Sequence, residues 1–178
     1  MGDEHSELEQ FLAKVEARAF RMAQFATGNR DDALELVQEA MLALAERYAD
    51  RDASEWPPLF HRILQSRIND WYRRRKVRRW TLAWGDDPRG SEMPEPEFPD
   101  RQATDPADGV ARQQAMAALQ QALGQLPLKQ QQAFLLRIWE GLDVKATAFA
   151  MNCSEGSVKT HLHRATMKLR EILGEHWP

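Results

Sequence analysis

The chain has very little cysteine. Its 178 residues include one, Cys153. A single cysteine cannot form an internal disulfide, which points to a reducing compartment. Cys153 stands where a turn between two helices needs a small residue, so we interpret it as a packing residue and not as a catalytic one.

The chain also lacks a long apolar run. No stretch approaches the roughly 20 residues that a helix needs to cross a bilayer. The N-terminal residues are acidic, unlike those of a secretory signal. We therefore expect a cytoplasmic protein without membrane insertion.

No catalytic constellation is evident in the sequence. It has no carboxylate cluster, nucleophile motif or phosphate-binding loop. His161 and His163 are two positions apart on an expected helix, so their side chains point in different directions and form a poor metal pair. We predict that the protein is not an enzyme and needs neither a metal nor a cofactor.

The net charge of −3 conceals a strong segregation of charge along the chain. Between Gly85 and Asp108 there are eight acidic residues, two basic residues and five prolines. Such a segment cannot bury enough apolar surface to offset the entropy lost on ordering. Residues 1–84 carry equal numbers of acidic and basic residues, whereas 110–178 carry eight basic and five acidic ones. We predict an all-α protein with two small helical domains, 1–84 and 110–178, joined by a flexible acidic, Pro-rich linker at 85–109.

Apolar residues at helical spacing predict three helices in the first domain. The first begins at a capping box, Ser6 to Glu9, and ends at Thr27-Gly28-Asn29. The second opens at Asp31-Asp32. Its expected core stripe is Leu34, Val37, Met41, Leu44 and Tyr48. Leu36 lies about 200° from Leu34 at 100° per residue, which predicts that it faces outward among carboxylates.

The third helix follows Trp56-Pro57-Pro58 and runs into a cationic stretch. Six of the seven residues from Arg73 to Arg79 are basic. Such a run binds phosphate without reading sequence, or it is a solvated face. Trp71, Tyr72 and Trp80 flank it, and aromatic rings beside cations are typical of proteins that bind single strands.

The segment from Leu142 to Ala165 has the layout of a helix-turn-helix. Ala148 is small where two helices must approach closely. Asn152 stands at the turn, where it tolerates a left-handed backbone. Ser154 is a good N-cap for the second helix, and Val158 packs that helix onto the first. This pattern favours a DNA-reading helix over an ordinary helix pair.

Together these motifs resemble the extracytoplasmic-function group of bacterial RNA polymerase sigma factors, of the sigma-70 superfamily. Residues 32–40 are similar to the family's helix for the clamp of the polymerase β′ subunit. The resemblance implies a docking patch. Its residues are Asp32, Glu35, Leu36, Gln38 and Glu39.

The rest of the chain extends the resemblance to promoter recognition. Residues 59–63 and 69–74 are similar to the segment that opens and reads the −10 element. The implied contacts for melting are Arg62, Asn69, Trp71, Tyr72, Arg73, Arg74, Arg75 and Lys76. Residues 126–142 and 154–165 resemble the C-terminal domain that reads the −35 element. The implied contacts there are Ser154, Glu155, Gly156, Ser157, Lys159, Thr160, His163 and Arg164.

The resemblance implies a transcription initiation factor with core RNA polymerase, through its β′ clamp helices and β subunit, and promoter DNA as partners. An anti-sigma factor is a further possible partner. The family pattern is broken at Gln65-Ser66, Thr147, Asn152 and His161, so base contacts are not carried over at Gln65, Ser66 and His161. The alternatives are a stand-alone helix-turn-helix regulator, which needs only the second half and normally a dimer seam that is not evident, and a protein-binding adaptor.

Overall fold

The computed structural model describes residues 2–83 and 106–174, and the side chains of 7–78 and 114–174. Within these ranges every regular element is helical, which confirms the all-α prediction. The elements are α1 (Gly2–Thr27), α2 (Arg30–Tyr48), α3 (Trp56–Ala83), α4 (Pro106–Gly124), α5 (Leu128–Phe134), the π-helical turn η1 (Leu135–Trp139), α6 (Val144–Met151) and α7 (Glu155–Leu173). No described helix is both apolar enough and long enough to cross a membrane.

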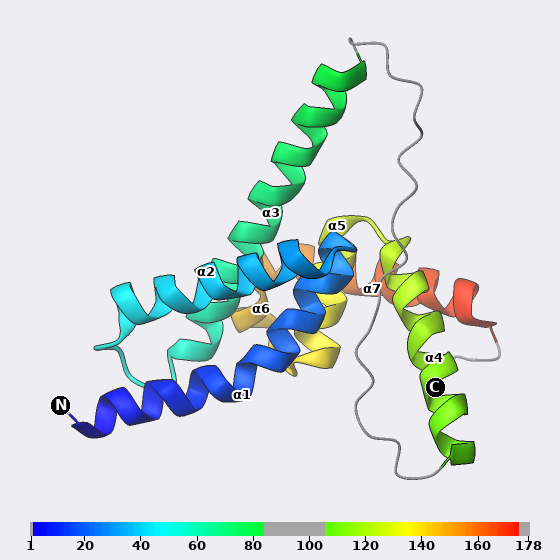
Figure 1. Cartoon of the computed structure of the whole chain (residues 1–178). Coiled ribbons are helices and arrows are strands. Elements are labelled where there is room, and N and C mark those ends of the chain that lie inside the picture. The colour runs from blue at the N-terminus through cyan, green and yellow to red at the C-terminus, as the bar shows by residue number, and fades with distance from the viewer. Residues whose placement is uncertain (1, 84–105, 175–178) are drawn as a thin grey trace.

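The N-terminal half is a three-helix unit of α1, α2 and α3 (Figure 1). Helix α1 starts at Gly2, so the predicted capping box at Ser6 was wrong as a helix start. The chain turns between α1 and α2 at Gly28, whose φ of 65° is the left-handed conformation that glycine accepts without strain. Asn29 then caps α2, because its Oδ1 accepts from the N–H groups of Asp31 (2.9 Å) and Asp32 (3.0 Å).

The buried face of α2 differs from the predicted stripe. Leu36 is only 2% exposed, so the prediction that it faces outward was wrong. The buried residues of α2 are Ala33, Leu36, Val37, Ala40, Ala43 and Leu44. Val37 and Leu44 belong to the predicted stripe. The other four lie next to predicted positions, and three of them are alanines, which let α2 approach its neighbours closely. Leu34, Met41 and Tyr48 are instead half-buried on the flanks.

The first half of helix α3 packs in the core, and its second half projects from the body of the molecule. Near its start, Phe60, Leu64 and Ile68 are buried, and Trp56 donates from Nε1 to the Tyr48 carbonyl (3.0 Å). Leu59 and Ile63 are half-buried. The remainder of α3 extends well beyond the packed body of the molecule (Figure 1). The cationic run therefore lies on the projecting end of α3.

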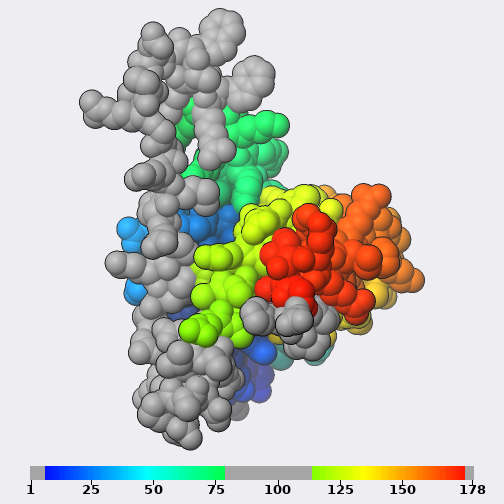
Figure 2. Space-filling view, turned by 90° about the vertical axis from the view of Figure 1, so that its right-hand side faces the viewer, coloured from blue at the N-terminus to red at the C-terminus, as the bar shows by residue number. Residues whose placement is uncertain are grey.

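The C-terminal half packs α4, α5 and α6 around α7. Figure 2 shows α4 and the C-terminal end of α7 side by side on one face of the molecule. Val158, Ala165, Leu169 and Leu173 form the buried stripe of α7. Pro106–Gly109 are already part of α4, so the predicted linker ends earlier than expected. The rest of that acidic segment lies outside the described residues.

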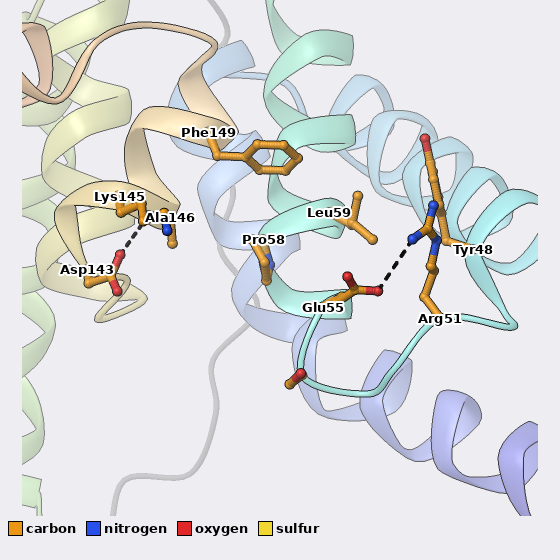
Figure 3. A pocket seen from close by; sticks show the side chains of 10 residues that line it. Tyr48, Arg51, Glu55, Pro58, Leu59, Asp143, Lys145, Ala146 and Phe149 are labelled. Carbon is orange, nitrogen blue, oxygen red and sulfur yellow. Dashed lines mark hydrogen bonds and ion pairs between the residues drawn. The ribbon is translucent and has the colours of Figure 1, made fainter.

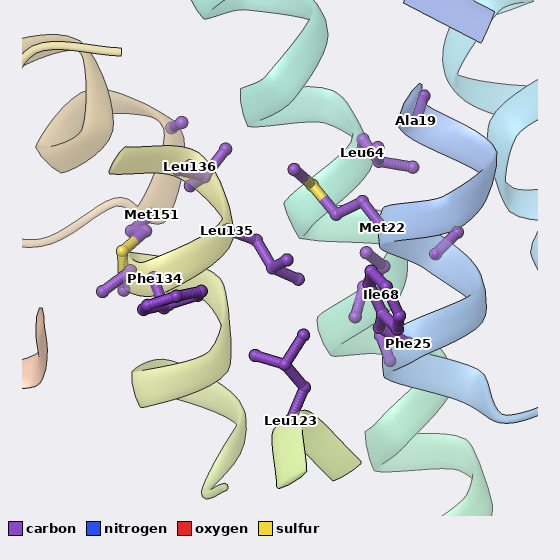
Figure 4. Close-up of a cluster of buried hydrophobic side chains, with 14 of the residues drawn as sticks. Ala19, Met22, Phe25, Leu64, Ile68, Leu123, Phe134, Leu135, Leu136 and Met151 are labelled. Atoms are coloured by element: carbon purple, nitrogen blue, oxygen red, sulfur yellow. The ribbon is translucent and has the colours of Figure 1, made fainter. Parts of the chain in front are cut away.

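The two halves share one apolar core. Leu123 and Leu135 of the C-terminal half point toward Phe25 and Ile68 of the N-terminal half (Figure 4). Trp139, at the end of η1, meets the Phe25 ring edge-on at 6.1 Å between centroids. The sequence predicted two halves but contained no indication that they pack together.

Candidate nucleic-acid and protein interfaces

The helix-turn-helix is present in the C-terminal half as α6, a turn and α7. Asn152 adopts φ 52° and ψ 51°, which confirms the left-handed turn expected at that position. Ser154 caps α7 as predicted, since its Oγ accepts from the Ser157 N–H at 3.1 Å. Val158 is fully buried and Ala148 is 8% exposed, so the two helices are in close contact. The turn therefore fixes the direction in which α7 leaves the domain.

The predicted −35 residues lie along the N-terminal half of α7 and mostly face outward. All but Ser157, which is half-buried, are exposed: Ser154, Glu155, Gly156, Lys159, Thr160, His163 and Arg164. Gly156 has open space where a side chain would stand, because a Cβ there would meet only Ser154 Oγ, at 3.9 Å. This face carries two side chains that are always positively charged near pH 7, Lys159 and Arg164, beside small polar groups. It can contact phosphates and base edges in a major groove.

The structure explains the environment of three residues of this motif, Thr147, His161 and Cys153. Thr147 is fully buried, and its Oγ1 donates to the Asp143 carbonyl at 2.7 Å, so a polar group is accommodated in the core. His161 is half-buried on the inner flank of α7. Burial lowers its pKa from the usual value, and Arg164 and Lys129 lower it further, so it stays neutral near pH 7. Burial raises the pKa of the Cys153 thiol, which suits a packing role.

The predicted −10 residues fall into two groups on α3. Arg62 and Asn69 are engaged by the C-terminal half. Arg62 donates from Nη1 to the Phe149 carbonyl (3.3 Å) and from Nη2 to Asn152 Oδ1 (3.4 Å), and its guanidinium lies 4.4 Å from the centre of the Phe149 ring. Asn69 Oδ1 accepts from Gln132 Nε2 at 3.2 Å.

The second group lies farther along α3. Trp71 is half-buried, with its ring edge-on to Tyr72 and the Arg75 guanidinium 5.1 Å above it. The Tyr72 hydroxyl donates to the Ala26 carbonyl at 2.7 Å, and the residue is 36% exposed. Arg73, Arg74 and Lys76 are exposed, and Arg73 pairs with Asp70 one turn back. Side chains beyond Arg78, including Trp80, lie outside the described ones.

Helix α2 presents an outward face other than the one predicted. Five of its exposed residues recur every three or four positions along one stripe: Asp31, Glu35, Gln38, Leu42 and Glu46. Leu42 is 61% exposed and is the large apolar residue of this stripe. Glu39 is half-exposed and pairs with Arg67 of α3 (Oε2–Nη1 3.5 Å), and Asp32 is half-buried beside the cap. Of the predicted docking residues, Glu35 and Gln38 are therefore exposed, Asp32 and Glu39 are partly buried, and Leu36 is buried.

Some contacts between the halves involve residues that the sequence did not single out. His61 Nε2 lies 3.4 Å from Glu140 Oε2, and both side chains are more than 90% buried. A groove also lies between the halves, with Tyr48, Pro58 and Leu59 on one wall and Lys145 and Phe149 on the other (Figure 3). Arg62 and Phe149 are 87 positions apart, and no local sequence pattern predicts such a contact.

Among the described residues, no group of three His, Cys, Asp or Glu side chains is arranged to hold a metal ion.

Comparisons with known proteins show relatives of this chain in sequence and in fold. Residues 116–169 match the family model "Sigma-70, region 4". The chain is 30% identical over 169 residues to the RNA polymerase sigma-E factor of Streptomyces coelicolor, covering 94% of this chain and 86% of that protein. It is 28% identical over 178 residues to the ECF RNA polymerase sigma factor SigM of Mycobacterium tuberculosis, covering 97% and 80%. A solved structure of the sigma factor RpoE with the anti-sigma factor NepR from Bartonella quintana has a similar fold, with a TM-score of 0.70, 20% identity and coverage of 93% and 95%.

Proposed function

Because this chain belongs to the extracytoplasmic-function sigma factors of the sigma-70 family, which direct RNA polymerase to promoters, we propose that its three exposed surfaces divide that work among polymerase docking, −10 melting and −35 reading. Sigma factors are initiation factors and not enzymes, so the surfaces act by binding alone. The alternative of a stand-alone regulator, which needs only the C-terminal half, does not account for a relative that aligns over 94% of the chain.

Helix α7 reads the −35 element in this proposal. The supporting observation is the left-handed turn at Asn152, which holds α7 with its N-terminal residues pointing out of the domain. Lys159 and Arg164 contact phosphates or guanine edges, and the free N–H groups at the start of α7 face the backbone of the DNA. His161 is half-buried, so it is assigned no base contact, and the exposed His163 is a further candidate for one.

The arm formed by the end of α3 captures the melted strand. Arg73, Arg74 and Lys76 are exposed cations on a helix that projects from the body, and Trp71 presents an aromatic ring half-covered by Arg75. Unstacking a base step costs a few kcal/mol, which contacts to the released strand must offset. Cations and a stacking ring on one arm supply both kinds of contact.

Helix α2 docks on core polymerase through the stripe of Glu35, Gln38 and Leu42. Leu42 takes the place that the family resemblance suggested for Leu36, because Leu36 is buried and Leu42 is 61% exposed. An exposed leucine within an acidic fringe suits a partner helix with apolar and basic side chains. Residues of a docking surface must be exposed in the free protein, and this stripe meets that condition.

An anti-sigma factor is a further partner in this proposal. Its support is the similarity to a sigma factor that was solved in complex with the anti-sigma factor NepR. An inhibitor of this kind would compete with core polymerase for the chain. Competition between the two in a binding assay would measure it.

The test of the division of labour is transcription from fragmented genomic DNA by bacterial core polymerase, with and without the chain. We expect the chain to produce discrete start sites that share sequences near −10 and −35. Lys159→Ala with Arg164→Ala should reduce transcript yield from these sites at least tenfold, without changing binding to core polymerase. The matched control is Lys168→Ala, an exposed α7 cation paired with Glu171 at 3.1 Å. Equal start-site use by both variants would contradict the −35 assignment.

A further inference from the structure

Helix α1 has an exposed charged face that the three proposed surfaces do not use. Lys14, Arg18 and Arg21 are all exposed, and at 100° per residue they fall within about 60° of one another. We call these three residues the cationic stripe, which spans about 10 Å along α1 at 1.5 Å per residue. The exposed Glu16 lies at least about 140° from each of them, and Glu7, on the same side, is about two turns before Lys14. Over these two turns, this side of α1 therefore presents charge of one sign.

The cations of the stripe have no carboxylate partner among the described residues. No Asp or Glu stands three or four positions from any of them, which are the spacings at which side chains on a helix meet. None of the ion pairs between described residues includes them. Lys14 with Arg18 and Arg18 with Arg21 are instead like-charge neighbours, which destabilise a helix. An anionic ligand would relieve this repulsion, so the stripe indicates one.

The stripe lacks the apolar anchor that is typical of a protein-binding surface. The exposed residues Ala13 and Ala17 stand beside the cations, and none of the large apolar side chains exposed in the described part of the chain lies on α1. Protein interfaces depend on a few large side chains that become buried, as proposed for Leu42 on α2. Nucleic-acid interfaces depend instead on cations that neutralise phosphates. The composition of the stripe therefore favours nucleic acid over an acidic protein.

The stripe also lies near the base of the α3 arm. The Tyr72 hydroxyl donates to the Ala26 carbonyl at 2.7 Å, which joins the start of the arm to the last turn of α1 (Figure 1). Arg21 is five residues before Ala26, or about 7.5 Å along the helix axis. A DNA strand that leaves the arm at its base can therefore reach the stripe within a few nucleotides.

From these observations we propose that Lys14, Arg18 and Arg21 form a further phosphate-binding site, which holds the backbone of promoter DNA next to the segment captured by the α3 arm. The site binds phosphate and reads no base, because Ala13 and Ala17 beside the cations have no hydrogen-bonding side chain. This inference rests on the DNA-binding role proposed for the arm. It is independent of polymerase docking by α2.

Photocross-linking tests which macromolecule the stripe contacts in the complex of the chain, core polymerase and labelled promoter DNA. Ala17→p-benzoylphenylalanine places the reactive group beside the cations and leaves all three in place. Glu16→p-benzoylphenylalanine is the matched control, since it is an exposed neighbour on another side of α1. We expect a cross-link to DNA near the −10 element from position 17 and none from position 16. A cross-link from position 17 to a polymerase subunit instead, or no cross-link to DNA, would overturn the proposal.

Promoter binding at several salt concentrations measures the phosphate contacts themselves. Lys14→Ala with Arg18→Ala and Arg21→Ala should weaken binding of the holoenzyme to a promoter recovered in the transcription assay above at least tenfold. The slope of log K against log salt should fall by about three if the stripe neutralises phosphates of a duplex and by about two if they belong to a single strand. Binding to core polymerase should be unchanged, and circular dichroism would verify that the variant is folded.

The matched control removes the same charge from exposed cations that belong to none of the proposed binding surfaces. These are Arg51, Lys145 and Lys168, each replaced by alanine. This variant should keep the slope of the unmodified chain. An equal decrease in the control, or an unchanged slope for the stripe variant, would overturn the site on α1 but leave the arm and α7 assignments standing. Absence of salt-dependent promoter binding by the unmodified holoenzyme would contradict the proposed function, and this inference with it.

Discussion

Leu36 and Leu42 are the residues on which the sequence and the structure differ most. Both lie on α2, six positions apart, and only Leu42 is exposed. The sequence pattern was weighted by large apolar side chains, which placed the core on the side of Leu34 and Met41. The helix instead buries Ala33, Ala40 and Ala43, because small residues let α1 and α3 approach closely. Alanines carry little weight in a hydrophobic pattern, so their side of the helix was misjudged.

This difference predicts opposite effects of two leucine substitutions. Leu36→Ala should lower the free energy of unfolding by about 2–5 kcal/mol, because it leaves a cavity in the core. Leu42→Ala should change it by less than about 0.5 kcal/mol, since its side chain is already largely in solvent. Urea unfolding followed by circular dichroism measures both. A larger destabilisation by Leu42→Ala than by Leu36→Ala would contradict the placement of α2.

Residues with strict local requirements were predicted well. Asn152 and Ser154 were assigned to a left-handed turn and an N-cap, and both assignments are confirmed. Their conformations depend on neighbours within three positions, so the sequence contains the necessary information. The contact between His61 and Glu140 depends on how two distant helices pack, and the sequence does not encode it locally.

At the scale of elements, α7 combines a predictable helix with a testable surface. A Cβ at Gly156 would meet only Ser154 Oγ at 3.9 Å, so alanine is tolerated in the free protein. Gly156→Ala should keep or slightly raise stability, because alanine favours helix more than glycine does. Gly156→Glu should reduce promoter binding by the holoenzyme at least tenfold, since it places bulk and negative charge at the DNA-facing end of α7. Thermal unfolding measures the first effect and filter binding the second, and unchanged binding by Gly156→Glu would exclude close approach of DNA there.

Helix α3 is the second element whose surface leads to a prediction. Its first half is fixed by packing, whereas Arg73, Arg74 and Lys76 of its second half are exposed. Arg74→Ala with Lys76→Ala should impair promoter opening more than polymerase binding. The slope of log K for promoter binding against log salt should fall by about one for each phosphate that is no longer neutralised. Titration at several salt concentrations measures the slope. An unchanged slope would mean that these cations do not contact phosphate.

At the scale of the whole molecule, the sequence predicted two helical halves, but not their contact. Leu123 and Leu135 of one half and Phe25 of the other meet in one cluster. Periodicity shows that a helix has an apolar face, but not which helix covers it. Contacts between residues so far apart in the sequence follow from packing, so the packing of the two halves could be seen only in the structure.

Docking of α2 on core RNA polymerase is the step on which the other two surfaces depend. Size-exclusion chromatography of the purified chain with core polymerase tests it most directly, because it requires no knowledge of the promoter. Glu35→Lys with Leu42→Glu should abolish co-migration, whereas Glu16→Lys, an exposed charge reversal on α1, should retain it. Circular dichroism would verify that both variants are folded. Loss of co-migration with the α2 variant alone is the predicted result. Failure of the unmodified chain to bind, or binding unchanged by the α2 substitutions, would contradict this assignment.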